Sequence, residues 1–219
     1  MVLPMPPRFD RQEELIPRAR MLQESATVIG VGAVGRQVAL QLVALGIPRL
    51  QLIDFATVTL ADVIAEGFLS EDVGAPKVDA VGGLCHRAEP LLDLQTLCER
   101  FRPSQVAGAN VFCCLAAKTD RLPVWEPLCK HCRFWGDASR SAEAVRVLVA
   151  GDEGDHRSYR RILADSDGDA ARPAAVPLAY MGALAAALLM HQFVRYLRNQ
   201  PLVVDATFDF ATGTYVVAG

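Results

Sequence analysis

The stretch that decides the fold runs from residue 28 to residue 54. It begins Val28-Ile29-Gly30-Val31-Gly32-Ala33-Val34-Gly35, continues as an amphipathic segment, and ends Leu50-Gln51-Leu52-Ile53-Asp54. This order predicts a strand, a glycine turn that opens a helix, and a second apolar strand with an acid at its carboxyl end. A Gly-x-Gly-x-x-Gly turn in this setting is typical of a nucleotide site.

Each residue of the turn has a physical role in such a site. Gly30 permits the tight turn, Gly32 lets the backbone approach a phosphate, and Gly35 lets helix and strand pack closely. Ala33 lies at the start of the helix, whose unpaired N–H groups and partial positive charge favour an anion. Asp54 follows at about the spacing of an acid that binds a ribose. The alternative is a tight turn of an α/β core, with Asp54 capping the turn at the strand end.

Length and composition limit the remaining possibilities. The chain has 219 residues, 52% of them hydrophobic and 21% charged, which predicts a globular protein with one substantial core. The formal net charge is −3, which gives no broad electrostatic reason to expect nucleic acid or an anionic membrane as a partner. The first residues lack the apolar segment of a signal peptide, and six cysteines then indicate reduced thiols in a cytoplasmic protein.

Two segments of the sequence raise the question of a zinc site and of a membrane-spanning helix. Cys129-Lys130-His131-Cys132 has zinc-like spacing, but no second Cys-x-x-Cys completes four ligands, so we expect no structural zinc. Residues 173–190 carry no charge, yet Pro177 and Gly182 interrupt them and polar residues follow. We therefore predict a buried helix over about 178–197, whose small residues suit close packing against another helix or another subunit.

The order of elements predicts the architecture. We expect one domain over 1–219, composed of an N-terminal arm and helix (1–24), a Rossmann-like core (25–150), and a crossover, interface helix and terminal strands (151–219). Within it we place strands at about 26–31, 49–54, 94–100, 110–115, 134–136, 144–150 and within 203–217, and helices at about 33–45, 77–88, 125–132 and 178–197. We interpret 151–171, polar and rich in Asp and Gly, as an exposed crossover. The fold class is α/β, with a mostly parallel sheet, helices on both faces and an antiparallel C-terminal extension.

With these elements placed, the chain resembles the ThiF/MoeB/ubiquitin-activating (E1-like) adenylyltransferase family over nearly its whole length. Arg8-Phe-Asp-Arg11-Gln12 is similar to the family's N-terminal Arg-aromatic-x-Arg-Gln, and the glycine turn to its Gly-x-Gly-x-x-Gly. Leu45-Gly-Ile-Pro-Arg-Leu-Gln-Leu-Ile-Asp54 follows the family's strand. Glu71-Asp-Val-Gly-Ala-Pro-Lys77 matches its Asp-hydrophobic-Gly-x-x-Lys, which separates this chain from an ordinary dehydrogenase.

The resemblance implies a reaction and a set of roles. A carboxylate, usually the C-terminus of a ubiquitin-like or sulfur-carrier protein, attacks the α-phosphate of Mg·ATP and gives an acyl-adenylate and pyrophosphate. By position, Asp54 would bind the ribose, Lys77 would bind the phosphates, and Arg11 would do so from the partner subunit of a homodimer. Residues 30–35 would line the pocket. Such chemistry needs neutralisation of phosphate charge more than a protein base.

The chain departs from the family at several active-site positions. Ala56 stands where the family has a second acid after the strand, and Asp62, Ala65 and Glu66 stand where it has Asn, Arg and Gln. Ala116 replaces the aspartate that helps hold Mg²⁺, and no cysteine fits the family's thioester position. Two acids and no arginine would then face the triphosphate. This favours an alternative function, a catalytically impaired homologue that binds nucleotide or a protein as a scaffold.

The remaining alternatives concern single residues and one other function. Lys118 or Arg121 could compensate the lost charge, Lys77 could be a solvated lysine, and Arg11 could pair at the surface with Glu13 or Glu14. Asp62 and Glu66 could be solvated loop acids, or they could form a metal site. The glycine motif with Asp54 would also allow an NAD-dependent oxidoreductase, but no Tyr-x-x-x-Lys or His/acid pair follows the cofactor half.

Overall fold

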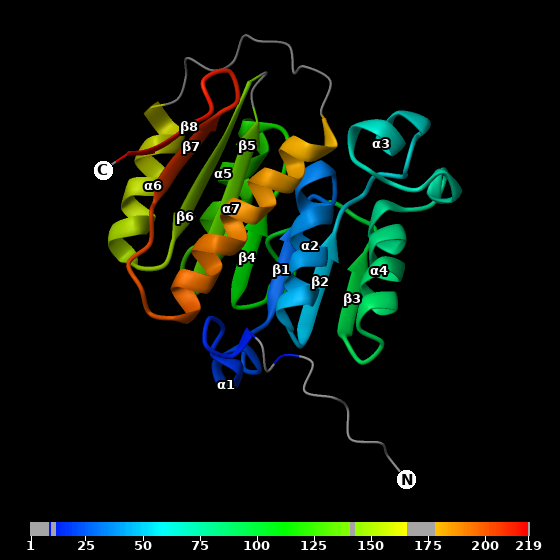
Figure 1. The fold of residues 1–219 in the computed structure, drawn as a ribbon, viewed down its shortest axis with the longest axis horizontal. Coiled ribbons are helices and arrows are strands. Elements are labelled where there is room, and N and C mark those ends of the chain that lie inside the picture. The colour runs from blue at the N-terminus through cyan, green and yellow to red at the C-terminus, as the bar shows by residue number, and fades with distance from the viewer. Residues whose placement is uncertain (1–8, 10–11, 141–142, 166–177, 219) are drawn as a thin grey trace.

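The fold is built on one eight-stranded sheet (Figure 1). The computed structural model describes residue 9 and residues 12–140, 143–165 and 178–218. Over these ranges the strands follow the order β3-β2-β1-β4-β5-β6-β7-β8. The order reverses direction at β1, whose neighbours are β2 and β4, and in open α/β sheets ligands bind outside the carboxyl ends of strands at such a point.

The first half of the sheet is parallel. Its two central strands, β1 and β4, are short and buried along their whole length, whereas the edge strand β3 is partly exposed. Parallel strands with helices on both faces are expected to be continuously hydrophobic in this way. The strands are β1 (Ala26–Ile29), β2 (Arg49–Ile53), β3 (Asp93–Leu97), β4 (Asn110–Cys113) and β5 (Phe134–Arg140).

The second half of the sheet is antiparallel. β6 (Ala144–Ala150) pairs with β5, β7 (Asp205–Asp209) pairs with β6, and β8 (Thr214–Ala218) forms the edge. This arrangement confirms the predicted fold class, a mostly parallel α/β sheet with an antiparallel C-terminal extension.

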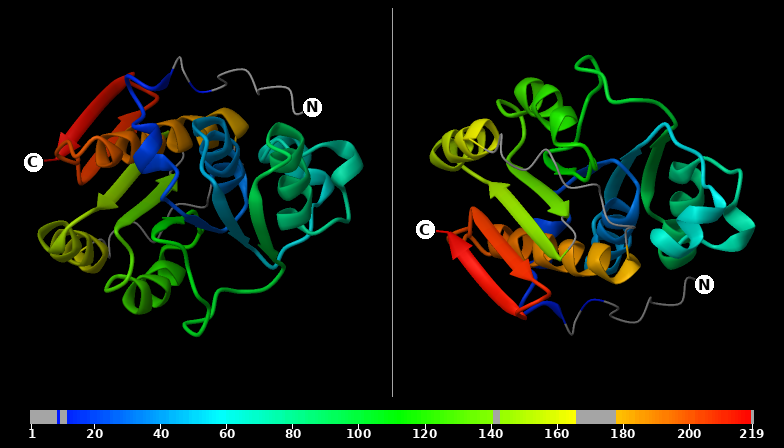
Figure 2. Two further views of the ribbon diagram at one scale, coloured as in Figure 1. Left: turned by 90° about the horizontal axis from the view of Figure 1, so that it is seen from below. Right: turned by 90° about the horizontal axis from the view of Figure 1, so that it is seen from above.

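Helices cover both faces of the sheet, as Figure 2 shows from below and above. α2 (Ala33–Leu45), α4 (Lys77–Ala88) and α7 (Ala179–Leu197) pack on one face and contribute to the larger hydrophobic core. α5 (Arg121–Leu128) and α6 (Glu153–Asp165) pack on the other face over a smaller core. Shorter elements are α1 (Arg18–Met21), α3 (Leu60–Ala65) and the 3₁₀ turns η2 (Ser70–Asp72) and η3 (Lys118–Asp120).

The small residues of α7 pack against α2 within the chain. A Cβ atom added at Gly182 would lie 2.4 Å from the carbonyl oxygen of Ala33, so only glycine allows this approach. The helix predicted over 178–197 is confirmed, and its glycine serves contact with another helix. The homodimer remains a prediction.

The main difference from the sequence-based expectation is α6, which lies within the segment interpreted as an exposed crossover. Tyr159 is fully buried, and Ile162 and Leu163, three and four residues later, pack against the same core. Three apolar residues at helical spacing are enough to bury one face of an otherwise polar helix. The helix expected at about 125–132 begins and ends four residues earlier, and the loop over 55–74 contains α3 and η2.

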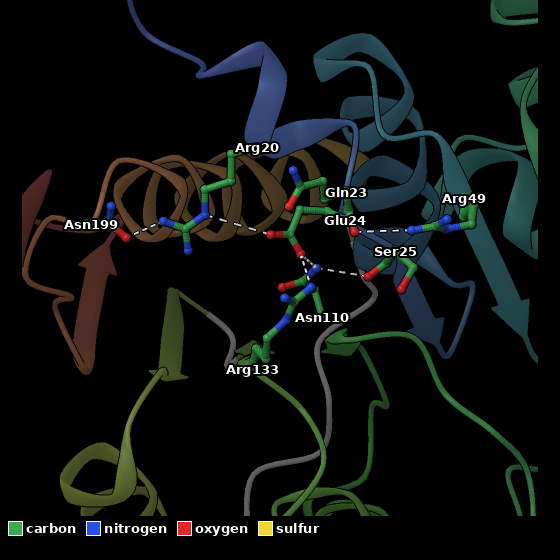
Figure 3. A network of polar contacts seen from close by, with 8 residues as sticks. All are labelled: Arg20, Gln23, Glu24, Ser25, Arg49, Asn110, Arg133 and Asn199. Carbon is green, nitrogen blue, oxygen red and sulfur yellow. Dashed lines mark hydrogen bonds and ion pairs between the residues drawn. The ribbon is translucent and has the colours of Figure 1, made fainter.

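A polar network fixes the opposite end of the parallel strands (Figure 3). The buried carboxylate of Glu24 accepts hydrogen bonds from Asn110, at the start of β4, and from Arg133, both at 2.8 Å. Arg20 of α1 pairs with Glu24 and donates to Asn199, beyond the end of α7. These arginines lie at the amino ends of the strands, away from the glycine turn.

Among the described helices, none combines the length and the apolar composition required to cross a bilayer.

Candidate functional site

The glycine turn between β1 and α2 has the geometry that its sequence predicts. Gly30 has a φ of +86°, a conformation that L side chains rarely adopt, and a Cβ atom there would lie 2.9 Å from the carbonyl oxygen of Cys114. A Cβ atom at Gly35 would lie 1.8 Å from the carbonyl oxygen of Gly30. The turn therefore requires glycine at both positions, and it brings α2 directly against β1.

The N-terminus of α2 opens at the carboxyl end of the sheet. Gly32 is its N-cap and contributes no side-chain cap, and Ala33, its first residue, is buried. The first amide groups of a helix have no intrahelical acceptor and carry a partial positive charge. The helix thus presents a site where an anion is favoured.

Asp54 connects the glycine turn to the end of β2. Its carboxylate accepts a hydrogen bond from the Val31 N–H at 2.6 Å and another from the Ala56 N–H at 2.9 Å. The turn-capping role considered from the sequence is therefore present. A carboxylate has about four acceptor positions, so two remain for other donors. Ribose binding by Asp54 stays a prediction.

Lys77, the first residue of α4, is only 7% exposed. Its Nζ lies 2.6 Å from Oε2 of Glu66 and 3.2 Å from Oδ1 of Asp62, and 5.4 Å from the centre of the Phe68 ring. The alternative of a solvated lysine is wrong, because this side chain is buried between two carboxylates.

Glu66 lies over the first turn of α2. One of its carboxylate oxygens, Oε1, is 3.2 Å from the position that a Cβ atom of Gly32 would occupy. Asp62 is fixed beside it by hydrogen bonds from the N–H and the hydroxyl of Thr59, each 2.7 Å long. The two acids that stand where the family has Asn and Gln therefore face Lys77 and the glycine turn. The alternative of solvated loop acids is wrong, because their side chains are only 16% and 15% exposed and both pair with Lys77.

The charges shift one another's pKa values. Burial alone would lower the pKa of Lys77, but the hydrogen bonds and charges of Glu66 and Asp62 outweigh it and raise that pKa. Burial raises the pKa of Glu66, and the neighbouring charges of Asp62 and Asp54 add to this, against the opposing effect of Lys77. The pKa of Asp62 is lowered because its bonds with Thr59 and Lys77 exceed the effect of burial.

Sequence reasoning missed two arginines near this site. Arg140 ends β5 and is close enough to Glu66 for the two charges to interact, while burial lowers its pKa. Arg36 lies one turn into α2, and the contacts of its buried side chain are described below. Motif matching does not reveal Arg140, but the parallel alignment of β4 and β5 brings the end of β5 to the edge of the sheet that carries the glycine turn.

Arg121 does not supply the missing charge. Its guanidinium pairs with Asp137 at 2.9 Å and donates to the carbonyl oxygens of Leu115 and Ala138, all in the core. The structure does not describe the side chain of Lys118, the other candidate. Arg11 also lies outside the described residues.

The described residues do not fit a magnesium ion held by the protein. Ala116 lies exposed in the loop after β4 and has no side-chain oxygen, while Asp62 and Glu66 are already paired with Lys77. No group of three or more His, Cys, Asp or Glu side chains in the described ranges is arranged to hold a metal.

Comparison with known proteins supports the resemblance. Residues 10–117 match the model of the ThiF family, which confirms the family indicated by the sequence motifs. No curated protein shows significant sequence similarity to the chain.

Several solved structures share the fold. The crystal structure of selenomethionine PaaA superposes with a TM-score of 0.76 at 18% identity, covering 96% of this chain and 81% of PaaA. E. coli MccB with the selenomethionine form of MccA gives a TM-score of 0.78 at 13% identity, covering 97% and 71% of the two chains. E. coli MccB with ATP gives a TM-score of 0.72 at 13% identity, again covering 97% of this chain and 71% of MccB. At these identities the similarity shows the fold alone.

Proposed function

We propose that this chain, a member of the ThiF family, binds Mg·ATP at the glycine turn and adenylates the C-terminal carboxylate of a peptide or small protein. Ubiquitin-like and sulfur-carrier proteins are the substrate class that the resemblance implies. Solved MccB structures hold ATP or the peptide MccA, which supports considering both kinds of ligand here.

One observation carries the proposal. Asp54, Lys77 and the open N-terminus of α2 converge at the carboxyl end of β1 and β2, where the sheet reverses its order. A 2.6 Å hydrogen bond from the Val31 N–H connects Asp54 to the glycine turn. Glu66 connects Lys77 to the same turn, because it accepts a hydrogen bond from Lys77 and lies over Gly32. This convergence of an acid, a lysine and a helix N-terminus supports binding of a ribose and a phosphate here.

The reaction needs little from the protein beyond position and charge. A carboxylate oxygen attacks the α-phosphorus, the bond between that phosphorus and the oxygen leading to the β-phosphate breaks, and pyrophosphate leaves. Lys77 would neutralise charge on the phosphates once its contact with Glu66 is released. A preorganised donor contributes roughly 3–4 kcal/mol to the transition state, and Lys77 would contribute less, because its contact with Glu66 must be broken first.

ATP–pyrophosphate exchange tests the activity. The protein is incubated with Mg·ATP, labelled pyrophosphate and a library of peptides with free C-terminal carboxylates, and a matched library with amidated C-termini is the control. We expect exchange only with free carboxylates, and its loss in Lys77→Ala. Exchange that is equal in both libraries would contradict the proposal.

A second candidate function, an impaired homologue acting as a scaffold, is favoured by a specific observation. Lys77 is neutralised by two carboxylates, and Ala116 offers no ligand for magnesium. Binding of ATP without exchange for any free carboxylate would support this candidate over the enzyme.

Assembly and location belong to the same proposal. We propose a homodimer in which Arg11 of the partner subunit completes the phosphate site, in a cytoplasmic protein. Analytical ultracentrifugation of wild type tests for the dimer. Mixing Arg11→Ala subunits with Lys77→Ala subunits then tests whether the two subunits share a site. In each mixed dimer one of the two sites carries neither substitution, and about half of the dimers in a random one-to-one mixture are mixed, so the mixture should regain about a quarter of the wild-type exchange activity.

A further inference from the structure

Arg36 is a buried cation whose guanidinium makes no ion pair or hydrogen bond with the side chains and backbone of the described residues. The side chain is 9% exposed, and its Nε has no hydrogen-bond acceptor among them. A buried charge normally requires compensation, because removing it from water costs several kcal/mol. An unpaired arginine therefore points to an anion that binds beside it.

The position of Arg36 directs it toward the glycine turn. Gly32 and Arg36 are one turn apart on the same face of α2, and the Arg36 N–H donates to the Gly32 carbonyl at 2.9 Å. Side chains in helices point back toward the N-terminus. The guanidinium Nη1 lies 3.5 Å from the position of a Cβ atom on Gly67, the residue that follows Glu66.

Arg36 and Lys77 flank the same aromatic ring. The guanidinium carbon of Arg36 is 5.7 Å from the centre of the Phe68 ring, and Nζ of Lys77 is 5.4 Å from it. Lys77 is satisfied by Asp62 and Glu66, whereas Arg36 has no such pair. Burial lowers the pKa of Arg36 and the charge of Asp72 opposes this, while burial raises the pKa of the Cys85 thiol to about 12.

We propose that Arg36 binds the polyphosphate of the nucleotide, and that it supplies from α2 the positive charge that α3 lacks at Ala65. Arg36 lies beside the end of α3, and a guanidinium presents five donors suited to phosphate oxygens. This inference rests on the proposed function for the nucleoside part of the ligand, but its polyphosphate part can be tested alone.

Calorimetric titration with adenosine, AMP, ADP, ATP and inorganic tripolyphosphate tests the assignment. Arg36→Met retains much of the side chain's length and removes its charge, and Arg36→Lys retains a charge. The matched control is Arg49→Met, an exposed arginine at the amino end of β2. We expect Arg36→Met to weaken ATP and tripolyphosphate about 10- to 100-fold, as for lost charged hydrogen bonds, and to leave adenosine unchanged. Arg36→Lys should restore part of the loss.

The outcomes separate this inference from the proposed function. If wild type binds ATP, and Arg36→Met binds each of the five ligands with the same affinity as wild type, the inference is wrong and the proposed function stands. If wild type binds tripolyphosphate through Arg36 but neither adenosine nor ATP, the proposed function fails and the inference stands. The wild-type protein alone also tests the inference, even if Arg36→Met does not fold. If tripolyphosphate does not raise the melting temperature of wild type, the inference is wrong.

Discussion

At the scale of single residues, the site is governed by the charges around the first turn of α2. Lys77 is paired with Glu66 and Asp62, and Arg140 is close enough to Glu66 for the two charges to interact. Lys77 is already bonded to Glu66 at 2.6 Å, so a phosphate that binds Lys77 must displace a carboxylate. The energy of this exchange sets how tightly a polyphosphate binds.

Glu66→Gln should strengthen ATP binding about tenfold, or about 1.4 kcal/mol. The amide oxygen can still accept a hydrogen bond from Lys77, but the negative charge over Gly32 is gone. Calorimetric titration with Mg·ATP measures the change. Glu153→Gln, on the exposed side of α6, is the control and should bind ATP as wild type does. Equal affinity in Glu66→Gln and wild type would show that Glu66 does not oppose the phosphates.

The sequence predicted some of these residues and not others, for a physical reason. Asp54 and Lys77 belong to motifs whose spacing along the chain reflects the geometry of the turns that hold them. Asp62 and Glu66 were found as departures from such a motif. Arg140 could not be found in this way, because only the parallel pairing of β4 and β5 brings it to the site. Arg36 follows the glycine motif directly, but its sequence position does not show that its side chain is buried.

At the scale of elements, the site depends on how closely α7 crosses the start of α2. Gly182 touches the carbonyl group of Ala33, the first residue of the helix whose N-terminus faces the ligand. The amide groups of that turn are therefore positioned by a helix that is distant in sequence. Packing of α7 and the shape of the glycine turn are linked.

Gly182→Ala should lower the free energy of unfolding by about 1–3 kcal/mol, the usual cost of overpacking. Gly83→Ala is its matched control in α4, where an added Cβ atom meets nothing within 4 Å. The control should raise the free energy of unfolding by about 0.5–1 kcal/mol, because alanine loses less entropy in a helix. Urea denaturation measures both. A stabilising effect of Gly182→Ala would contradict the packing of α7 on α2.

Elements with a strong hydrophobic pattern were predicted well, and those stabilised by few contacts were not. The helix over Ala33–Leu45 and the strand over Ala144–Ala150 have the predicted bounds, because glycine, proline and apolar runs delimit them. α6 was missed because charged residues, chiefly Arg and Asp, dominate its sequence. Its packing depends on Tyr159, whose burial is a property of the folded sheet.

At the scale of the whole molecule, a buried polar network joins α5 and α6 to the sheet. Arg121 and Asp137 form an ion pair at 2.9 Å with side chains 4% and 1% exposed, and the Tyr159 hydroxyl donates to Asp137 at 2.6 Å. Removing one partner of a buried pair leaves an uncompensated charge, which is far more costly than loss of a surface pair.

Asp137→Ala should therefore lower the free energy of unfolding by about 3–5 kcal/mol. Its control is Glu99→Gln, which removes an exposed pair with Arg102 at 3.5 Å and should cost less than about 1 kcal/mol. Thermal and urea unfolding of the three proteins measure the difference. Similar costs for the two substitutions would show that the core does not depend on the Arg121–Asp137 pair.

The measurement that tests the central claim most directly is calorimetric titration of the purified protein with Mg·ATP, beside Asp54→Ala and with NAD as a second ligand. We predict saturable heat with ATP, none with NAD, and loss of ATP binding in Asp54→Ala while the variant remains folded. Absence of ATP binding in wild type, or binding of NAD alone, would contradict the assignment of the glycine turn as an ATP site.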